Sequence, residues 1–438
     1  MRKFFWVLLP AFGAGVWALP ALTAEVSNEK YDGIALFGRV INFVEKQYVE
    51  KVSTRDLVYG AIKGMLEALD PHSNFLPPDI YKQLKSDTSG KFGGVGVEVW
   101  VPKDGVLTVV NPMEDTPAWR AGIKSGDRII KIDGTSTKGM SMVEVNSRMR
   151  GEPGSKIHIT VQRDGAAQPL DFEVRRETIN IRSVKHEMLT GKVGWVKVNQ
   201  FQEKSAREIG AAIKDMESKG KLSGLILDLR NNPGGLLDEA VETANLFVDS
   251  GVIVSTIGRD PGDKEVRSAK SGIARLDFPM VVLINGGSAS AAEIVAGALK
   301  DHKRAIVAGQ KSFGKGSVQT VIPLGDDVGL KLTIARYYTP SGTSIQATGI
   351  EPDLLLDDLD ATALKRLRKK LRHGSEADLK NALANDGAGR VKRREKDGSD
   401  AEEMEDSPRP LDPKTDYQVQ QALNLLKSST FFRQVPKT

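Results

Sequence analysis

The chain of 438 residues contains no cysteine and only five histidines. Without cysteine, it forms no disulfide, holds no thiolate-bound metal and has no cysteine nucleophile. The histidines show neither HExxH nor HxH spacing, so the sequence predicts no metal site and no cofactor. The five are His72, His158, His186, His302 and His373.

A strong excess of one charge is also missing. The 62 basic and 57 acidic residues leave a net charge of +5, and the two signs are mixed along the chain. This balance does not predict a nucleic-acid partner. The apolar content of 40% and charged content of 27% are typical of a soluble globular protein, and the length predicts two or three domains.

The first 24 residues, MRKFFWVLLPAFGAGVWALPALTA, have a basic start and an uncharged apolar run. This layout is typical of a secretory signal, and we expect export to a periplasm. Cleavage after Ala18 and cleavage after Ala24 both fit the small-residue rule. An uncleaved membrane anchor is the alternative, because about 20 apolar residues can span a bilayer.

Two regions of different character follow. Apolar residues at helical spacing predict an N-terminal helical region over 25–85, which is either a dimer arm or a cap on the core. Residues 86–180 combine a Gly93–Gly96 loop, a Pro-Ala-x-x-Ala-Gly-Ile helix and a Gly-Asp-x-Ile strand. This order resembles a PDZ domain of the permuted bacterial type.

The remaining chain predicts an α/β core and a terminal helix. Residues 181–355 alternate helices with continuous apolar strands, as a parallel sheet buried on both faces requires. We expect part of 25–85 to join this core. Residues 356–410 are polar and charged and predict a linker. Residues 411–438 include an amphipathic helix that needs a surface on which to dock.

The stretch NGGSASAAEI, Asn285 to Ile294, joins an apolar strand to a helix and carries two serines, Ser288 and Ser290. Such a junction exposes a side chain and supplies helix amides without internal partners. A serine there suits nucleophilic catalysis if a base takes its proton. Serine is also a common N-cap, and on these residues alone capping is the favoured role for either serine.

A base for this serine must come from elsewhere. His302 lies about 18 Å along the predicted helix from Ser290, and we expect it at the surface. Lys315 is flanked by Gly314 and Gly316, and lysine acts as a base only when neutral, which burial or a nearby cation favours. The alternative for this GKG stretch is an ordinary surface turn.

Gln319 follows Lys315 by four residues and predicts how the two side chains meet. In a helical turn they would share a face and could hydrogen bond, whereas a strand would hold them about 13 Å apart. The pairing therefore predicts a turn. The glycines of NNPGG, residues 231–235, fit either anion-binding amide donors or a plain tight turn.

Several stretches together resemble the carboxyl-terminal processing (tail-specific) family of serine proteases. They occur in family order over most of residues 30–355 and are LDPHSNFLPP, FGGVGVEV, LILDLRNNPGGLLDEAV, NGGSASAAEIVAGAL, SFGKGSVQT and YYTPSGTSIQATGIEPD. The resemblance implies an α/β protease core of crotonase/ClpP-like ββα units, an inserted PDZ domain and helical N- and C-terminal segments. It also implies an exported endopeptidase that processes or degrades envelope proteins.

The resemblance further implies residue roles. Ser290 matches the nucleophile, the middle serine of a Ser/Thr-Ala-Ser-Ala-Ser-Glu run, in which Ala292 replaces a third serine of many members. Lys315 matches the base and Gln319 the residue that positions it. The oxyanion donors match the amides of Ala291 and Gly235. The substrate's C-terminus should bind the PDZ residues Gly94, Val95, Gly96 and Val97.

The implied partners are proteins with apolar C-termini, a further copy of the chain, an adaptor protein and, peripherally, a membrane. We also expect Arg150, at the end of the second PDZ helix, to relay tail binding, with a plain surface arginine as the alternative. Two rival functions compete. A PDZ domain on an inactive protease core would show no proteolysis, and an acyl-CoA enzyme would turn over thioesters without it.

Overall fold

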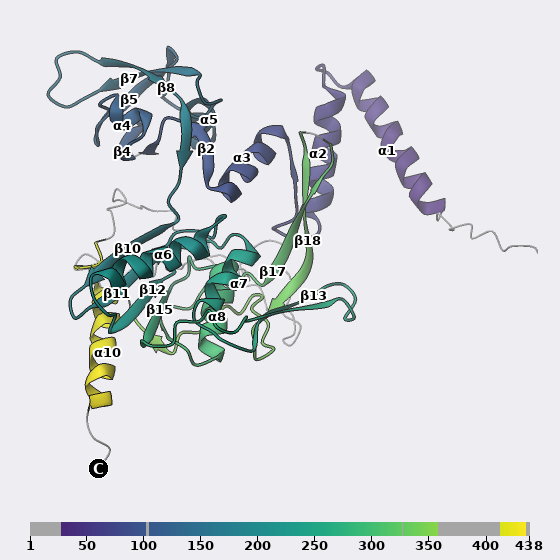
Figure 1. Ribbon diagram of the computed structural model, residues 1–438. Coiled ribbons are helices and arrows are strands. Elements are labelled where there is room, and N and C mark those ends of the chain that lie inside the picture. The colour runs from purple at the N-terminus through teal and green to yellow at the C-terminus, as the bar shows by residue number, and fades with distance from the viewer. Residues whose placement is uncertain (1–27, 102–104, 326, 358–411, 435–438) are drawn as a thin grey trace, which may run out of the picture. The chain divides into compact units, whose positions relative to one another are not determined.

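The computed structural model describes residues 28–101, 105–325, 327–357 and 412–434 (Figure 1). The predicted signal peptide, nearly all of the predicted linker and the chain's last four residues lie outside these ranges. The chain divides after Ile62 into two compact units, and the boundary falls within a helix. No described helix has both the length and the apolar character that crossing a bilayer requires.

The N-terminal region is built mainly of helices. They are α1 (Asn28–Gln47), α2 (Thr54–Glu67) and α3 (Pro78–Ser89), with the short strand β1 (Asn74–Leu76) before α3. Proline at the start of α3 and Gly90 in the left-handed conformation after it fix both ends of that helix. On α1, several large apolar side chains are exposed, namely Tyr31, Ile34, Leu36, Phe37, Val40 and Phe43.

The PDZ region contains a six-stranded antiparallel sheet. Its order is β3-β4-β5-β7-β8, with β6 paired to β5, and β3 is an edge strand. The strands are β3 (Val97–Trp100), β4 (Thr108–Pro112), β5 (Arg128–Ile132), β6 (Thr135–Ser136), β7 (Lys156–Gln162) and β8 (Leu170–Arg175), accompanied by α4 (Pro117–Arg120) and α5 (Met142–Met149). This region has its own apolar core, in which Ile129, Val145 and Ile157 are fully buried.

The prediction that Gly93 and Gly94 belong to a loop is wrong. They lie in β2 (Lys91–Gly94), which pairs with β9 (Glu177–Asn180) at the entry to and exit from the PDZ region. A side chain at position 93 would stand 2.1 Å from the carbonyl oxygen of Gly151. Glycine is therefore required here by close backbone approach, and only the second half of the predicted loop is one.

The six-stranded core sheet has the order β10-β11-β12-β15-β16-β19, parallel from β11 to β19. Its strands are β10 (Val184–Leu189), β11 (Val193–Val198), β12 (Gly224–Asp228), β15 (Met280–Ile284), β16 (Ile306–Gly309) and β19 (Leu354–Leu355). Every residue of β12 and β15 is buried, as the continuous apolar runs predicted for strands covered on both faces.

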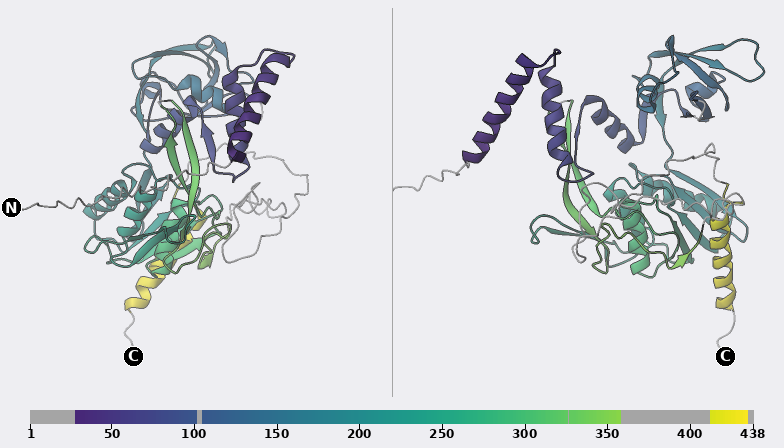
Figure 2. Two further views of the ribbon diagram at one scale, coloured as in Figure 1. Left: turned by 90° about the vertical axis from the view of Figure 1, so that its right-hand side faces the viewer. Right: turned by 180° about the vertical axis from the view of Figure 1, so that it is seen from behind.

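Helices cover both faces of this sheet (Figure 1). Leu225 and Leu227 of β12 pack with α6 (Ser205–Ser218), α7 (Leu237–Asn245) and α8 (Ala291–Asp301). Ile226 points the other way and packs with α10 (Tyr417–Gln434). In the rear view of Figure 2, α10 accordingly stands on the side of the sheet away from α8.

A second sheet adjoins the core. Its order is β1-β18-β13-β14, and β17 pairs with the long strand β18 from Gly329 to Arg336. The strands are β13 (Val252–Ile257), β14 (Lys264–Ser268), β17 (Ser317–Pro323) and β18 (Gly329–Tyr338). The β17–β18 register shifts between Val318 and Gln319, which marks a bulge near the end of β17 that follows the GKG stretch.

Candidate functional site

The site predicted from the sequence lies where three neighbouring parallel strands end. The loop 229–236 follows β12, the loop 285–290 follows β15 and the loop 310–316 follows β16. Because β12, β15 and β16 are adjacent and parallel, their carboxyl ends share one edge of the sheet. This edge is where open α/β sheets bind their ligands.

Ser290 lies at the start of α8 in a strained backbone conformation. Its φ is 55° and its ψ is −116°, a combination that non-glycine residues rarely adopt, and the residue is 8% exposed. Such strain costs on the order of 1–3 kcal/mol and collects at functional sites. A nucleophilic serine at a sharp, strained turn between a strand and a helix is also found in α/β-hydrolases.

The Glu293 carboxylate connects Ser290 to the loop that carries Lys315. Its Oε2 accepts hydrogen bonds from the backbone amides of Ser290 and Lys315, each at 2.8 Å. The two amide nitrogens therefore lie within twice 2.8 Å of each other. Oε1 accepts from the Ser312 hydroxyl at 2.6 Å and the Gly314 amide at 2.7 Å. The structure thus brings Ser290 and Lys315 together at the backbone.

Glu293 is fully buried, and burial raises its pKa to about 7, although its four hydrogen-bond donors act to lower it. Sequence reasoning missed this residue. The signal was present, because a serine followed three residues later by glutamate is the pattern of a helix capping box. Here the glutamate reaches back to the Ser290 amide and also gathers donors from a second loop.

Ser288 has a structural position. Its hydroxyl donates to the carbonyl oxygen of Leu229 at 2.8 Å and accepts from the Asn285 amide at 2.9 Å, and the residue is fully buried. It therefore ties the loop after β12 to the loop after β15. Of the two serines, Ser290 is the N-cap residue of α8, so a cap at Ser288 is not what the structure shows.

The glycines of the loop 231–235 approach Ser290 closely. A Cβ on Gly234 would stand 2.7 Å from the Ser290 Cβ and 3.0 Å from the Ala291 nitrogen. Gly235 has a φ of 139°, and a Cβ there would meet the Phe201 carbonyl oxygen at 2.0 Å. Both glycines are required by space as well as by conformation, and they place this loop beside the first amide of α8.

The helical turn predicted for Lys315 and Gln319 is wrong. Gln319 lies in β17, because the residues after Gly316 pair with β18 instead of coiling. Lys315 precedes the strand and is half-buried. A Cβ on Gly316 would lie 2.3 Å from the Gln346 nitrogen, so this glycine lets the loop press against the segment at Gln346.

The Gln319 amide is held by hydroxyl groups. Its Nε2 donates to Ser317 Oγ at 2.8 Å and to Thr333 Oγ1 at 3.3 Å. Thr333 Oγ1 donates to Asp70 Oδ1 at 3.1 Å. Asp70 belongs to the LDPHSNFLPP stretch, and it also accepts from the Ser73 hydroxyl at 2.7 Å. This stretch therefore reaches Gln319 through Thr333.

Tyr337 of β18 also reaches the serine. Burial raises the pKa of Tyr337 to about 12, which a hydrogen bond with the Ser290 side chain partly opposes. The phenol is therefore neutral at ordinary pH.

The sequence predicted His302 at the surface, and the structure differs. It is half-buried at the far end of α8, where its Nε2 donates to the Val252 carbonyl oxygen at 2.7 Å. The eleven-residue helix separates it from Ser290. The separation along the helix that the sequence predicted is therefore present, and it keeps His302 away from the serine.

In the PDZ region, the predicted peptide-binding residues Gly94 to Val97 lead into β3. Among the residues that the structure describes, this strand pairs with β4 alone and forms one edge of its sheet. The Gly96 carbonyl oxygen accepts from the Met113 amide at 2.9 Å and the Thr116 hydroxyl at 2.9 Å, which fixes the start of β3.

Arg150 directly follows α5 and is half-buried. Its guanidinium contacts Asp87 of α3 at 3.3 Å and lies 4.7 Å from the ring centre of Phe92. Arg150 therefore joins the second PDZ helix to the segment that enters the PDZ region.

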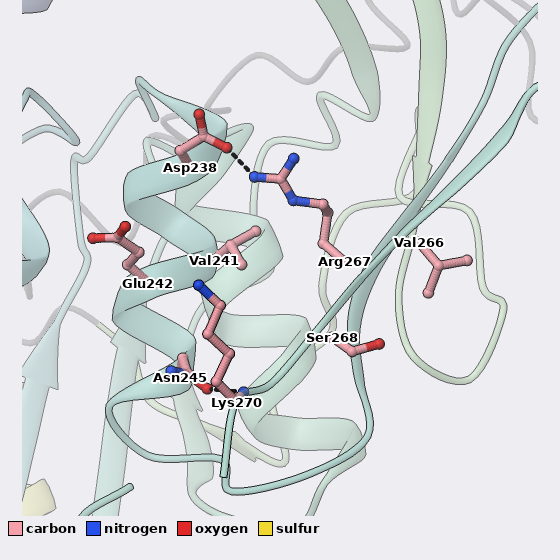
Figure 3. A pocket seen from close by; sticks show the side chains of 8 residues that line it. All are labelled: Asp238, Val241, Glu242, Asn245, Val266, Arg267, Ser268 and Lys270. Carbon is pink, nitrogen blue, oxygen red and sulfur yellow. Dashed lines mark hydrogen bonds and ion pairs between the residues drawn. The ribbon is translucent and has the colours of Figure 1, made fainter. Parts of the chain in front are cut away.

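A pocket of about 530 Å³ lies between α7 and β14 (Figure 3). Arg267 faces Asp238 across it, and the Asn245 side chain accepts from the Lys270 amide at 2.6 Å. None of the predicted site residues lines this pocket. Over the described ranges, no group of three His, Asp or Glu side chains is arranged to hold a metal ion.

Comparison with known proteins identifies relatives along the whole chain. The profile of "Peptidase family S41" matches residues 192–356, that of "PDZ domain" matches 108–163, and that of "Activating protease CtpB N-terminal domain" matches 20–79. A carboxy-terminal-processing protease of Bartonella bacilliformis is 41% identical over 98% of this chain and 96% of its own length.

Two further relatives are more distant. The carboxy-terminal processing protease CtpA of Bacillus subtilis is 36% identical, covering 81% of this chain and 77% of its own. The solved structure of a photosystem II D1 C-terminal processing protease is 32% identical, with a TM-score of 0.45, covering 80% of this chain and 99% of that one. With 41% identity over nearly its full length, this chain belongs to the carboxy-terminal-processing proteases of peptidase family S41 and is a serine-type endopeptidase that carries a PDZ domain.

Proposed function

We propose that this protease binds the C-terminal tail of its protein substrates in the PDZ region and cleaves peptide bonds with Ser290 as nucleophile and Lys315 as base. The observation that carries the proposal is the shared Glu293 Oε2, which holds the Ser290 and Lys315 amides at 2.8 Å each. The strained, nearly buried Ser290 at the start of α8 supports the choice of nucleophile.

The reaction requires Lys315 in its neutral form. Its amine takes the proton of the Ser290 hydroxyl while the oxygen attacks the substrate carbonyl carbon. The oxyanion that forms is bound by the amides of Ala291 and Gly235. The close approach of Gly234 to the Ala291 amide supports this pair of donors. The protonated lysine then gives its proton to the leaving amine, and water hydrolyses the acyl-enzyme.

Gln319 positions Lys315. Both hydrogens of its Nε2 are directed at Ser317 and Thr333, so the Oε1 atom is left as an acceptor for an amine. A neutral amide suits this role, because a carboxylate would favour the charged lysine. The bulge beside Gln319 supplies a local change of side-chain direction within β17.

The PDZ region selects substrates by strand addition. The open edge of β3 accepts an extended tail, and the backbone amides of Gly94 to Val97 capture its carboxylate. Arg150 relays this event, because it contacts both α3 and β2 from the end of α5. The substrates are envelope proteins with apolar C-termini, which an adaptor protein can deliver.

The protein works in a periplasm after export by its first 24 residues or while anchored there by them, with peripheral contact to the membrane. It assembles with further copies of itself through α1, whose exposed apolar side chains need cover. We further propose that the core, with its parallel strands and the serine at a strand-to-helix junction, follows the crotonase/ClpP-like plan of ββα units.

The test is digestion of a denatured protein with an apolar C-terminus by the full-length enzyme and three variants. Ser290→Ala and Lys315→Ala each abolish cleavage, and Ser288→Ala retains much of it. A folded Ser288→Ala variant without activity, beside an active Ser290→Ala variant, would reverse the assignment of the nucleophile. Thioester turnover without proteolysis would replace the proposal with an acyl-CoA enzyme.

A further inference from the structure

A buried cluster of charges lies beneath the loop 231–235, outside the proposed catalytic groups. The Arg230 guanidinium is at its centre and is 5% exposed. Its Nε and Nη2 donate to the two oxygens of Asp228, at 3.0 Å and 2.6 Å. The Asp228 carboxylate is fully buried and also accepts from Trp195 Nε1 and Lys197 Nζ, each at 3.3 Å.

The C-terminal helix completes this cluster. Arg230 Nη1 donates to the Asp416 carboxylate at 3.0 Å and 3.1 Å and to Gln418 Oε1 at 2.8 Å. Asp416 precedes α10, and its Oδ1 caps that helix by accepting from the Val419 amide at 2.9 Å. With Asp416, two cations face two anions. Without it, Lys197 and Arg230 would share the single charge of Asp228 in a buried place.

Burial makes this balance matter. An unpaired charge away from water is far more costly than a surface charge. The two basic groups respond differently: burial lowers the pKa of Lys197, and Asp228 acts to raise it. The pKa of Arg230 is raised because its carboxylate partners outweigh burial. The Asp416 carboxylate therefore stabilises the buried, charged Arg230 side chain.

Within the loop 229–236, Arg230 directly precedes the stretch 231–235 that carries the glycines. Its carbonyl oxygen accepts from Lys197 Nζ, so both its backbone and its side chain are held. The next residue, Asn231, donates its amide to Asn285 Oδ1 at 2.8 Å, which links the loop to the strand end before Ser290. A movement of Arg230 therefore moves the loop that carries Gly235.

We propose that Arg230 is a positioning residue for the oxyanion loop and that α10 sets its position through Asp416. The inference rests on the proposed function, because the loop matters for rate only if the Gly235 amide binds the oxyanion. The C-terminal helix is then part of the catalytic scaffold, although its sequence carries no catalytic group. Misplacement of the loop costs transition-state binding more than substrate binding, so kcat falls and KM does not.

The experiment compares two full-length variants of α10. Asp416→Asn keeps a helix cap, because asparagine caps as well as aspartate. It removes the charge, and it can place an amide donor against Arg230 Nη1. Leu423→Ala instead removes a buried apolar contact between α10 and the sheet and leaves the charges intact. We expect Asp416→Asn to lower kcat by about tenfold to a hundredfold with KM unchanged within about twofold.

Leu423→Ala is the matched control. We expect it to lower the urea midpoint of unfolding more than Asp416→Asn does, while kcat of the folded fraction stays near wild type. A wild-type kcat in Asp416→Asn would overturn the inference, as would losses of kcat that follow the losses of stability in both variants. Activity in Ser290→Ala would instead refute the proposed function, so the two failures are distinguishable.

Discussion

The buried carboxylate of Glu293 should make the stability of this protein depend on pH in a way that one substitution removes. Glu293→Gln keeps the shape of the side chain and removes its charge. In the wild type, burial raises the Glu293 pKa from 4.5 to about 7. The folded protein therefore binds this proton more tightly than the unfolded chain does.

The sign of the effect follows from that difference. The stabilisation from the Glu293 proton is complete below pH 4.5 and is lost as the pH rises through 7. One pKa unit corresponds to about 1.4 kcal/mol, so the Glu293 contribution to the free energy of unfolding falls by about 3 kcal/mol over this range. Glutamine does not titrate, and the variant lacks this fall.

Urea unfolding at pH 4.5 and pH 8 measures this fall in the free energy of unfolding. The protein with Glu293 and the Glu293→Gln variant both carry Ser290→Ala, which prevents self-digestion. All other titrating groups are common to the two proteins, so the difference between their pH dependences isolates Glu293. Absolute stability is a poorer guide, because glutamine replaces one carboxylate oxygen by an NH2 group that faces two of the four donors. Each donor left unsatisfied costs about 1–3 kcal/mol. The same pH dependence in both proteins would refute the reasoning.

Three further predictions concern the surroundings of Ser290. Gly235→Ala should reduce kcat by about a hundredfold or more, measured by peptide cleavage, because its Cβ meets the Phe201 carbonyl oxygen at 2.0 Å; a normal kcat would exclude the Gly235 amide as a donor. Thr333→Val should lower kcat several-fold, since one partner of the Gln319 amide is lost, and an unchanged pH profile of kcat would argue against that amide as the orienter of Lys315. Arg150→Ala should cleave at a basal rate that added tail peptide no longer raises, and normal stimulation would remove the relay.

The elements that position the site were predictable where one local pattern decides them. The continuous apolar runs indicated a parallel core sheet, and β12 and β15 are indeed buried throughout. The strand-to-helix junction at Ser290 was equally visible, because small residues, a serine and a glutamate three positions later form a local pattern. Identity to known relatives then established the family.

The path from Lys315 to Gln319 was not predictable, because their spacing of four residues fits a helical turn as well as a strand. Pairing with β18 decided for the strand, and that partner lies elsewhere in the sequence. Long-range contacts of this kind are absent from any local window. The Arg230–Asp416 contact spans 186 residues and depends on where α10 docks.

The hydrogen bonds of Glu293 were likewise only partly predictable from the local sequence. The capping pattern accounts for its bond to the Ser290 amide, but not for the bonds from Ser312, Gly314 and Lys315. Those donors come from the loop after β16, which the parallel pairing of β15 and β16 brings to the same edge. The local residue was visible in the sequence, and its partners were supplied by the fold.

The covalent intermediate tests the central claim most directly. Full-length enzyme is mixed with an activated ester of a short peptide, quenched in acid during the first turnover, digested with a second protease and mapped by mass spectrometry. The account predicts an acyl group on Ser290 in the wild type and none on that residue in Lys315→Ala. An acyl group on Ser288, or turnover with no acylated serine in the loop 285–290, would contradict it.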